Sequence, residues 1–496
     1  MRKLAKRVTE EFGAYSPKTV VFVAPTGYGK TEAAPYAFKR SGMPRAVHVA
    51  PMRTLVKAVY EKWLKHAAAV GLSEDDVGWQ YMSGRASFGK SPYFLRRAVA
   101  TTFDSFLYNL MKLPVARIDE GVAHYELPRS AIASSFVVFD EVHLYGGDPG
   151  QPDVQMFSAF LTAYVAVAEN PVLIITATLP QCVVKAVEKE AGKAGVEYAY
   201  VDYEEVVDEE YEDWIKRHFS IETRVVESIE EVPSHVFSKK TLFVFNTVEK
   251  AVQFYQKIRG DGVVLIHGRF AQRDREAKED ALKLAKTVVS TQVVEVGIDI
   301  DADVVVTDAA PITSLVQRAG RACRREGAGR RVCKVYVVKG DGDGVYDPNI
   351  VKKSVEAVEA GVDWKHPREA IERVYGGCAI DLDPEAYVLL KELDTRLHLG
   401  FSDAKKLLRA FCERGRGLAR DVLMVPVYVG NNPPSPEPDL MIPVGVKLAA
   451  RLLELGAGLL KTGGCPGDLC EALLRGCATL HYPKYDGELG LLVEEA

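Results

Sequence analysis

Residues 19–31 join an apolar run rich in β-branched residues to a loop with two glycines, Thr19-Val20-Val21-Phe22-Val23-Ala24-Pro25-Thr26-Gly27-Tyr28-Gly29-Lys30-Thr31. A helical pattern follows, so strand, loop and helix come in the order that a phosphate-binding loop requires. The glycines let the backbone wrap around a polyphosphate, with N–H groups and the helix N-terminus supplying positive potential. Lys30 can then reach the β- and γ-phosphates, and the Thr31 hydroxyl can bind Mg²⁺. Residues 24–31 are therefore predicted to bind a nucleoside triphosphate, although the first position is Ala24 rather than the usual Gly.

The composition is that of a globular protein. With 496 residues the chain is too long for a single core, and we expect two to four domains. The apolar fraction of 47% and the charged fraction of 26% are ordinary for such a protein. The chain has no run of about 18 uncharged apolar residues, and its N-terminus lacks the apolar core of a signal peptide. We expect a cytoplasmic protein that makes no membrane contact.

Charge is unevenly distributed along the chain. The net charge of −5 and the isoelectric point near 6.1 do not by themselves predict a nucleic-acid-binding protein. Residues 202–213, however, hold eight acids in twelve positions, whereas residues 318–334 hold seven bases and one acid. For contacts with phosphates, a local basic stretch matters more than the overall sum. Only 15 of the 496 residues are Asn or Gln, a depletion that favours a thermophilic origin.

The eight cysteines are scattered, mostly one at a time. This spacing predicts neither the disulfide framework of a secreted protein nor an iron–sulfur site. Cys465, Cys470, Cys477 and His481 lie close enough in the sequence to raise the alternative of a zinc site. Their spacing fits no standard zinc pattern, and buried structural thiols are the favoured interpretation.

The alternation of short apolar runs and helical patterns predicts the domain organisation. From residue 19 to about 200, β-branched runs alternate with helical segments, which indicates a parallel sheet with helices on both faces. The acidic stretch 202–213 resembles an exposed connection, and the same rhythm restarts at about residue 220. After about residue 380 the patterns are mostly helical, notably Pro384–Leu397 and Asp403–Arg414. We predict two α/β domains and a mostly helical C-terminal accessory domain, at residues 1–213, 214–378 and 379–496.

Two adjacent carboxylates, Asp140 and Glu141, follow the apolar strand pattern Val137-Val138-Phe139. The carboxyl end of such a strand is the edge of an α/β sheet at which ligands bind. There Asp140 is suited to hold the Mg²⁺ that bridges the β- and γ-phosphates, and Glu141 is suited to orient and deprotonate the attacking water. A single acid at this place would be no more than a solvated strand end. The pair, together with the phosphate-binding loop, predicts nucleoside triphosphate hydrolysis.

A cluster of arginines occurs in the segment Gln317-Arg318-Ala319-Gly320-Arg321-Ala322-Cys323-Arg324. Arg321 and Arg324 lie three residues apart, on one face of a helix, so both guanidinium groups can point at one anion. Arginines that stabilise charge on a γ-phosphate have this character. An Arg-rich helix alone is more often a solvated face or a nucleic-acid patch. The second α/β domain favours the catalytic interpretation, because an ATP site between two such domains needs cations from the far side.

The order of these motifs resembles that of superfamily 2 helicases with two RecA-like domains. Eight segments match in order: Ala24–Thr31 (motif I), Pro51–Leu55 (Ia), Thr101–Phe106 (the next nucleic-acid contact motif), Asp140–His143 (II, in its DExH form), Thr176–Thr178 (III), Phe243–Thr247 (IV), Ser290–Asp299 (V) and Gln317–Arg324 (VI). Four further segments are similar to the CRISPR-associated helicases of type I interference systems: Val293–Asp301, Ala310–Ile312, Ser314–Arg321, and His267–Phe270 with Arg273.

This resemblance implies that ATP binds between the two domains and that hydrolysis moves single-stranded DNA in the 3′-to-5′ direction. The implied catalytic residues are Lys30, Asp140, Glu141, Gln317, Arg321 and Arg324. Residues 24–31 would bind ATP together with Gly297 and Asp299 of the second domain, and Thr31 and Asp140 would hold Mg²⁺. Residues that would couple the ATP site to the strand are His143, Gln317, Thr176 and Thr178. Candidate contacts to the phosphate backbone are Arg53, Thr102 and Thr291, since movement along any sequence requires backbone rather than base contacts.

The sequence departs in one respect from many members of that family, which carry an N-terminal HD nuclease domain. Here the phosphate-binding loop begins at residue 24, and no His-Asp dipeptide occurs. The chain thus resembles a stand-alone helicase subunit, with a separate HD nuclease subunit and a guide-RNA interference complex as expected partners. A motor would extend the nearly balanced strand exchange that guide pairing begins. Two alternatives stay open: an RNA or DNA-repair helicase of superfamily 2, and an ATP-gated nucleic-acid-binding subunit that does not unwind.

Overall fold

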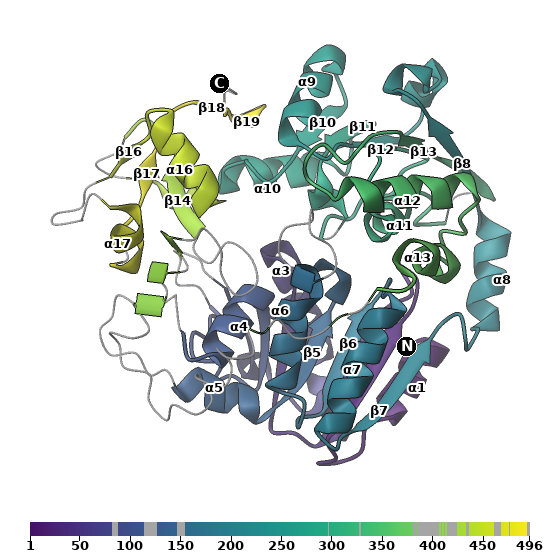
Figure 1. Ribbon diagram of the computed structural model, residues 1–496, viewed down its shortest axis with the longest axis vertical. Coiled ribbons are helices and arrows are strands. Elements are labelled where there is room, and N and C mark those ends of the chain that lie inside the picture. The colour runs from purple at the N-terminus through teal and green to yellow at the C-terminus, as the bar shows by residue number, and fades with distance from the viewer. Residues whose placement is uncertain are drawn as a thin grey trace.

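The structure of the chain is a computed structural model. It describes residues 1–81, 88–113, 126–145, 154–295, 297–326 and 329–378, isolated positions between 380 and 413, and residues 424–432, 436–460, 468–475 and 477–493. Figure 1 shows the N-terminal domain below, the second domain at the upper right and the C-terminal region at the upper left.

The first domain is built on a seven-stranded parallel sheet in the order β3-β4-β2-β5-β6-β1-β7. Its strands are β1 (Lys18–Val23), β2 (Arg45–Ala50), β3 (Val77–Gln80), β4 (Ala98–Thr102), β5 (Ser135–Asp140), β6 (Val172–Thr176) and β7 (Glu197–Asp202). The central strand β5 is buried along its whole length, as apolar runs are in parallel sheets with both faces covered.

Helices cover both faces of this sheet, because successive side chains of a strand point to opposite faces. Val20 and Phe22 of β1 belong to the core on one face, which also contains side chains of α1 (Lys3–Glu10), α2 (Ala33–Ser41) and α3 (Arg53–His66). Val21 belongs to the core on the other face, with side chains of α4 (Phe103–Leu110), α5 (Glu126–Ala133), α6 (Val154–Val165) and α7 (Gln181–Lys193). The phosphate-binding loop follows β1, between these two layers.

The second domain repeats this architecture with a six-stranded parallel sheet in the order β10-β11-β9-β12-β13-β8. Its strands are β8 (Phe219–Val226), β9 (Thr241–Val244), β10 (Val263–Ile266), β11 (Thr287–Ser290), β12 (Val304–Asp308) and β13 (Arg331–Val338). Its helices are α9 (Val248–Ile258), α10 (Gln272–Ala281), α11 (Ile312–Ala319), α12 (Pro348–Glu359) and α13 (Arg368–Tyr375). The prediction of two α/β domains with parallel sheets is confirmed.

The C-terminal region contains a small sheet that the sequence did not predict. Its strands are β14 (Met424–Tyr428), β15 (Met441–Gly445), β16 (Gly458–Leu459) and β17 (Leu480–His481), and its helices are α16 (Val446–Glu454) and α17 (Leu469–Leu474). Two of these strands have only two residues, and the other two contain prolines, Pro426 and Pro443, that face each other. Neither feature produces a strand pattern in the sequence. The helical patterns predicted at 384–397 and 403–414 lie outside the described residues, apart from isolated positions.

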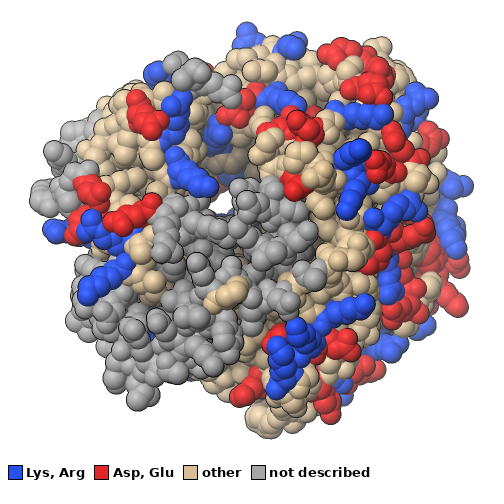
Figure 2. Space-filling view, viewed as in Figure 1, with Lys and Arg blue, Asp and Glu red and all other residues tan. Residues whose placement is uncertain are grey.

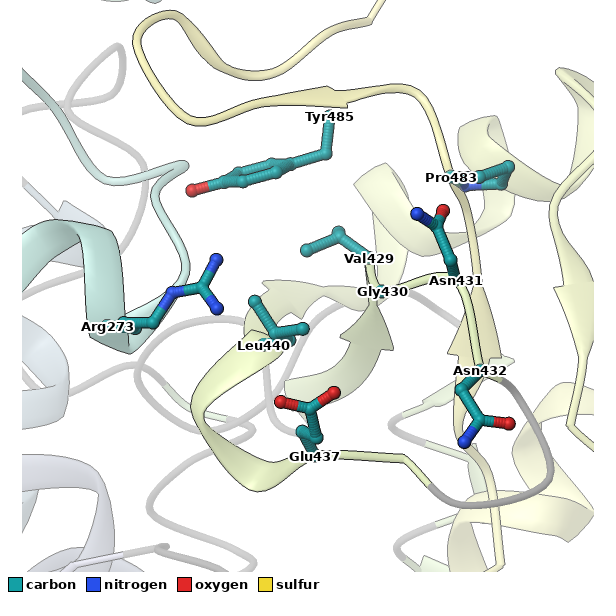
Figure 3. A pocket seen from close by; sticks show the side chains of 9 residues that line it. All are labelled: Arg273, Val429, Gly430, Asn431, Asn432, Glu437, Leu440, Pro483 and Tyr485. Atoms are coloured by element: carbon teal, nitrogen blue, oxygen red, sulfur yellow. The ribbon is translucent and has the colours of Figure 1, made fainter.

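A terminal hairpin of β18 (Tyr485–Asp486) and β19 (Gly490–Leu491) contacts the second domain beside α10. The Leu491 amide donates to the Arg269 carbonyl over 2.9 Å, and the Tyr485 hydroxyl donates to Asp274 Oδ2 over 2.6 Å. A pocket of about 400 Å³ lies between α10 and this region. Figure 3 shows Arg273 on one side of it, facing the Tyr485 ring and Leu440. The pocket is lined by none of the residues predicted for the ATP site.

The acidic stretch 202–213 connects the two domains, as predicted, but it is only partly exposed. Residues from 209 onward begin α8 (Glu209–His218), which joins the two domains at the right of Figure 1. Asp202 and Asp208 are buried, and tyrosine hydroxyls donate to both: Tyr200 to Asp202 Oδ2 over 2.5 Å and Tyr28 to Asp208 Oδ2 over 2.6 Å. These hydrogen bonds satisfy the carboxylates and so permit their burial.

The interpretation of the late cysteine cluster as buried thiols is wrong for Cys470 and Cys477. Disulfides join Cys182 to Cys378, Cys323 to Cys333 and Cys412 to Cys470, and Cys477 is likewise disulfide-bonded. Zinc therefore cannot use Cys470, and the described residues contain no cluster of three or more metal-ligating side chains. Scattered cysteines gave no pattern because paired residues lie up to 196 positions apart. Intracellular proteins of hyperthermophiles are known to be rich in disulfides.

Acidic and basic side chains are interspersed over the face shown in Figure 2. They do not gather there into a single basic surface, in keeping with the small net charge of the chain. Among the described helices, none is both long and apolar enough to cross a bilayer.

Candidate active site

The loop after β1 has the backbone shape that phosphate binding requires. Gly27 and Gly29 have φ angles of +83° and +88°, in the left-handed region where any side chain would be strained. The short 3₁₀ helix η1 (Lys30–Glu32) and then α2 follow directly. Lys30 lies inside the loop, where its Nζ donates to the carbonyls of Ala24 over 2.8 Å and Pro25 over 3.2 Å. Burial lowers the pKa of Lys30, and the carboxylates of Glu141 and Asp140 partly offset this effect.

The Tyr28 side chain packs inside the first domain and does not enter the site. Its ring is fully buried and packs edge-on against Tyr203 and Tyr211. Its hydroxyl accepts a hydrogen bond from the Leu4 amide and donates to Asp208. Of the residues predicted to bind nucleotide, Tyr28 can therefore contribute only its backbone.

Asp140, at the end of β5, lies against the loop. Thr31 Oγ1 donates to Asp140 Oδ2 over 3.2 Å, so the two predicted Mg²⁺ ligands are adjacent. Burial alone would raise the pKa of Asp140, but a hydrogen bond from His48 and the nearby charges of Lys62 and Lys30 hold it below its ordinary value. The carboxylate is thus ionised and, within the described part of the chain, its Oδ1 atom has no hydrogen-bond partner. A hydroxyl beside an ionised carboxylate is a donor set that fits Mg²⁺.

Glu141 has an uncommon backbone conformation, with a φ of +51°. A left-handed conformation in a non-glycine residue costs about 1 kcal/mol and is most frequent at functional sites. Burial raises the pKa of Glu141, against the charge of Lys30, and the neighbouring Asp140 raises it further. A carboxylate whose pKa is raised in this way takes up a proton more readily, as a general base must.

His143, Thr176 and Thr178 form a chain of hydrogen bonds that settles the protonation of the imidazole. Thr176 Oγ1 donates to the Thr178 carbonyl over 2.8 Å, so it must accept from His143 Nδ1, 2.9 Å away. Burial and the charge of Lys30 lower the pKa of His143 to about 3, which keeps the ring neutral. His143 Nε2 therefore carries no hydrogen, and no described residue donates to it. Motifs II and III are therefore in contact.

The second domain meets the loop at the segment that follows α11, which ends at Ala319, so Arg321 and Arg324 do not lie on a helix as predicted. A Cβ atom added to Gly320 would lie 2.5 Å from Thr26 Oγ1, so only a glycine permits this approach. Arg321 is buried beside Arg324, and burial lowers the pKa of Arg321 to about 9. Arg321 is also close enough to Glu141 for the carboxylate to offset part of this effect. Arg324 is in turn close enough to Lys30 to lower the pKa of that amine. Both predicted arginines therefore face the loop and the carboxylates of the first domain.

Arg318, which the sequence did not single out, is the structural centre of the second domain. It is completely buried, and its guanidinium donates to Glu295 Oε1 over 2.7 Å, Thr307 Oγ1 over 2.8 Å and Asn246 Oδ1 over 3.1 Å. These partners belong to the segments that resemble motifs IV and V, together with β12. Arg318 therefore holds three segments in register behind the arginines that face the first domain.

Asp299 lies at the edge of the site and is paired within its own domain. Its side chain is 57% exposed, with Oδ1 3.3 Å from Arg324 Nη1 and Oδ2 against Arg325. Gly297 has a φ of +81°, which again requires a glycine. A nucleotide that contacts Asp299 would thus compete with Arg324 for its carboxylate.

The predicted nucleic-acid contacts lie at the carboxyl ends of the strands. Thr102 ends β4 beside Ala50 of β2, and Arg53 begins α3 three residues after that strand. Thr102 Oγ1 accepts from the Ser105 amide, while the Arg53 guanidinium lies 5.9 Å from the centre of the Tyr81 ring. Thr291 follows β11 in the other sheet and is buried. Arg53 and Thr102 are thus neighbours, and Thr291 occupies the corresponding edge of the second domain.

Seven buried polar atoms of the predicted site lack a hydrogen-bond partner among the described residues. They are Asp140 Oδ1, Glu141 Oε2, His143 Nε2, Thr178 Oγ1, Gln317 Nε2, Arg321 Nε and Arg324 Nη1, of which the last makes an ion pair with Asp299 without a hydrogen bond. Each such atom costs about 1–3 kcal/mol unless something else satisfies it. Their concentration at one place, from both domains, indicates a site built for a polar, charged ligand with bound water.

Comparison with known proteins shows similarity to helicases. The family model described as DEAD/DEAH box helicase matches residues 6–187, and the one described as CRISPR-associated nuclease/helicase Cas3, C-terminal, matches residues 238–327. The CRISPR-associated helicase Cas3 of Thermoproteus tenax is 26% identical over 397 residues, which are 74% of this chain. The chain is thus similar to the CRISPR-associated superfamily 2 helicases. It spans 65% of the length of the T. tenax protein, and 52% and 40% of two further Cas3 relatives.

Solved structures agree on the fold. T. fusca Cas3-ADP has a TM-score of 0.64 at 18% identity, over 99% of this chain and 67% of that one. A chain of the structure titled CRISPR RNA-guided surveillance complex, pre-nicking, has a TM-score of 0.57 at 18% identity, over 96% of this chain and 68% of that one. These likenesses confirm the predicted tandem of two RecA-like domains.

Proposed function

We propose that this chain is an ATP-dependent motor that moves along single-stranded DNA in the 3′-to-5′ direction and unwinds target DNA in a type I CRISPR interference system. The observation that carries the proposal is the position of Arg321 and Arg324. They reach from the second domain toward Lys30 and Glu141 of the first, across a group of unpartnered polar atoms. A site completed by two domains changes when they separate, and this dependence lets hydrolysis drive movement.

Each residue of the site has a separate role in the proposed hydrolysis of ATP. Lys30 exchanges the carbonyls of Ala24 and Pro25 for phosphate oxygens, which is a short movement for its long side chain. Thr31 and Asp140 would hold Mg²⁺, which when bound would supply positive charge to the phosphates. Glu141 orients the attacking water and takes up its proton, and Arg321 and Arg324 stabilise the charge that develops on the γ-phosphate.

Coupling to the nucleic acid passes through His143 and motif III. His143 Nε2 is a buried acceptor near Lys30. The hydrogen on His143 Nδ1 is held by Thr176, the last residue of β6. Gln317, buried in α11 with its amide nitrogen free of described partners, is placed to sense the same space from the other domain. Arg53, Thr102 and Thr291 hold the phosphate backbone, and their separation changes as the domains close and reopen.

Replacing Lys30 by Ala, or Glu141 by Gln, is expected to lower kcat for ATP by about 100-fold or more, since each removes a preorganised group from the transition state. Lys39→Ala is the matched control, because Lys39 is a lysine of α2 that donates to the Ala69 carbonyl outside the site. Steady-state phosphate release measures the effect. Normal turnover by the Glu141→Gln protein would contradict the assignment of the site.

Strand separation distinguishes the proposed motor from its alternatives. We expect ATP-dependent unwinding of DNA duplexes with a 3′ single-stranded overhang, and little with a 5′ overhang. Preference for an RNA track would indicate an RNA helicase instead. Nucleic-acid affinity that changes with ATP, without strand separation, would indicate the ATP-gated binding subunit.

The proposal extends to partners and setting. Because of the family, we expect the chain to act with a guide-RNA surveillance complex and a separate HD nuclease subunit, in the cytoplasm of a thermophile. The disulfides and the depletion of Asn and Gln support a thermophilic setting.

A further inference from the structure

We infer that His48 and Trp63 position the carboxylate of Asp140 for Mg²⁺. Neither residue belongs to a motif described above. The inference rests on the proposed function in that it takes Asp140 as the metal ligand. It assigns to this chain a hydrogen-bonded relay, Trp63 to His48 to Asp140, that fixes which carboxylate oxygen is left for the metal.

The relay connects two elements beneath the site. His48 is on β2, where it lies next to Val138 of the neighbouring strand β5, and Trp63 is on α3. His48 is 1% exposed and Trp63 is 2% exposed. His48 Nε2 lies 3.2 Å from Asp140 Oδ2, and Trp63 Nε1 lies 3.2 Å from His48 Nδ1. The three groups thus form a continuous chain inside the first domain.

The indole decides the direction of every hydrogen bond in this chain. A tryptophan N–H can only donate, so His48 Nδ1 must accept. The hydrogen of the neutral ring is then on Nε2, from which it is donated to Asp140. Without Trp63 the ring could hold its hydrogen on Nδ1 instead and present a lone pair to the carboxylate.

The two oxygens of Asp140 are consequently unlike. Oδ2 receives hydrogen bonds from both His48 and Thr31, whereas Oδ1 is buried and receives none from any described residue. The relay therefore holds the carboxylate in one orientation and leaves Oδ1 as the oxygen available to the metal or its water. Partners of this kind, which orient a ligating group, typically change metal affinity by about 10–100-fold when removed.

A merely structural role explains the relay less well. The side chains around β2 that share its core are mostly apolar, such as Ala46 and Ala50. An imidazole buried there loses hydration that an apolar side chain would not lose, unless both nitrogens are satisfied. Both are satisfied here, and one of the two partners is the predicted metal ligand itself.

The test compares the affinity for ADP with and without Mg²⁺, measured by calorimetry on the full chain. His48→Phe removes the donor to Asp140, and Trp63→Phe removes only the group that fixes the tautomer. His48→Gln supplies a replacement N–H donor. Trp364→Phe is the matched control, since the Trp364 indole donates to Thr223 Oγ1 over 2.8 Å in the other domain.

We expect His48→Phe to bind metal-free ADP as tightly as the natural chain does. The increase in ADP affinity on adding Mg²⁺ should be about tenfold smaller in this variant. Trp63→Phe should lose a smaller part of that gain, His48→Gln should recover part of it, and Trp364→Phe should change nothing. Mn²⁺ binding followed by electron paramagnetic resonance should show the same ranking. A full Mg²⁺ gain in folded His48→Phe protein, or in folded Trp63→Phe protein, overturns the inference. Absence of any Mg²⁺ gain in the natural chain would instead contradict the proposed function.

Discussion

Arg318 and Arg321 differ in what surrounds them, although both are buried arginines of one short segment. Arg318 donates to side chains all around its guanidinium, and burial is more than offset by Glu295, which raises its pKa. Arg321 donates only to the Glu295 carbonyl among the described groups, and burial lowers its pKa to about 9. The first residue is satisfied by its own domain, whereas the second awaits a ligand.

Replacing each arginine by Ala should therefore have opposite consequences. Arg318→Ala leaves Glu295 buried without its partner, which costs about 3–5 kcal/mol, and should lower the melting temperature. Arg321→Ala should leave the melting temperature nearly unchanged and lower kcat for ATP by about 10³-fold or more. Calorimetric melting and phosphate release on both variants check this. Equal loss of stability in the two variants would show that Arg321 is structural.

How far the sequence predicts the site depends on whether a residue belongs to a recognisable motif. The conformations of Gly27 and Gly29 follow from one such motif, and Thr31 and Asp140, 109 residues apart, were assigned to one metal because each belongs to a motif of its own. His48 and Trp63 were not predicted, because a lone histidine in an apolar strand pattern is no signal of contact with a carboxylate 92 residues away. Arg318 was missed for the same reason, since its partners come from three segments of the sheet.

At the scale of elements, α8 shows how composition can mislead. Eight acids in twelve residues predicted solvent exposure, yet Asp202, Asp208 and Glu212 are buried and accept hydrogen bonds from tyrosine hydroxyls. His366 of the second domain is a further partner of Glu212. His366 Nε2 lies 2.8 Å from Glu212 Oε1, and Nδ1 lies 2.9 Å from Asp363 Oδ2. Ion pairs of His366 with Glu212 and Asp363 thus stabilise the connection between the domains, where the sequence predicted a linker.

This arrangement predicts a pH-dependent stability. The hydrogen bond to Asp363 and the charge of Glu212 raise the pKa of His366 to about 9, from about 6.5 in the unfolded chain. Below about pH 6.5 both states are protonated, so the contribution to stability is fully present there. It falls as the pH rises from 6.5 to 9 and is absent above, a total of up to about 3 kcal/mol.

The comparison with His366→Gln measures this contribution. The natural chain should melt at a higher temperature than the variant at pH 6, and the difference should shrink toward zero by about pH 10. Arg373→Gln is a control, because Arg373 pairs only with the exposed Glu369 of its own helix among the described residues. A difference that grows with pH would show that His366 is neutral in the folded chain.

For the whole molecule, the sequence predicted two parallel sheets but not the covalent link between them. Cys182 is in α7 of the first domain, and Cys378 follows α13 of the second, with Cα atoms 5.7 Å apart. Beside this bond the Gln181 amide donates to Glu372 Oε1 over 2.8 Å. The proposed motor is therefore tethered at one edge, so we expect its two domains to open about that edge.

Reduction of this disulfide should loosen the two domains relative to each other. Closing a loop of 196 residues stabilises a chain by about 2–5 kcal/mol, so Cys182→Ser should lower the melting temperature and enlarge the radius of gyration measured by X-ray scattering. Cys378→Ser should behave identically, and dithiothreitol should add little further expansion to either variant. Cys470→Ser is the control, because Cys470 pairs with Cys412 outside the two sheets. If the radius of gyration of Cys182→Ser matches that of the natural chain, the noncovalent contacts around α8 and α13 hold the domains together without the tether.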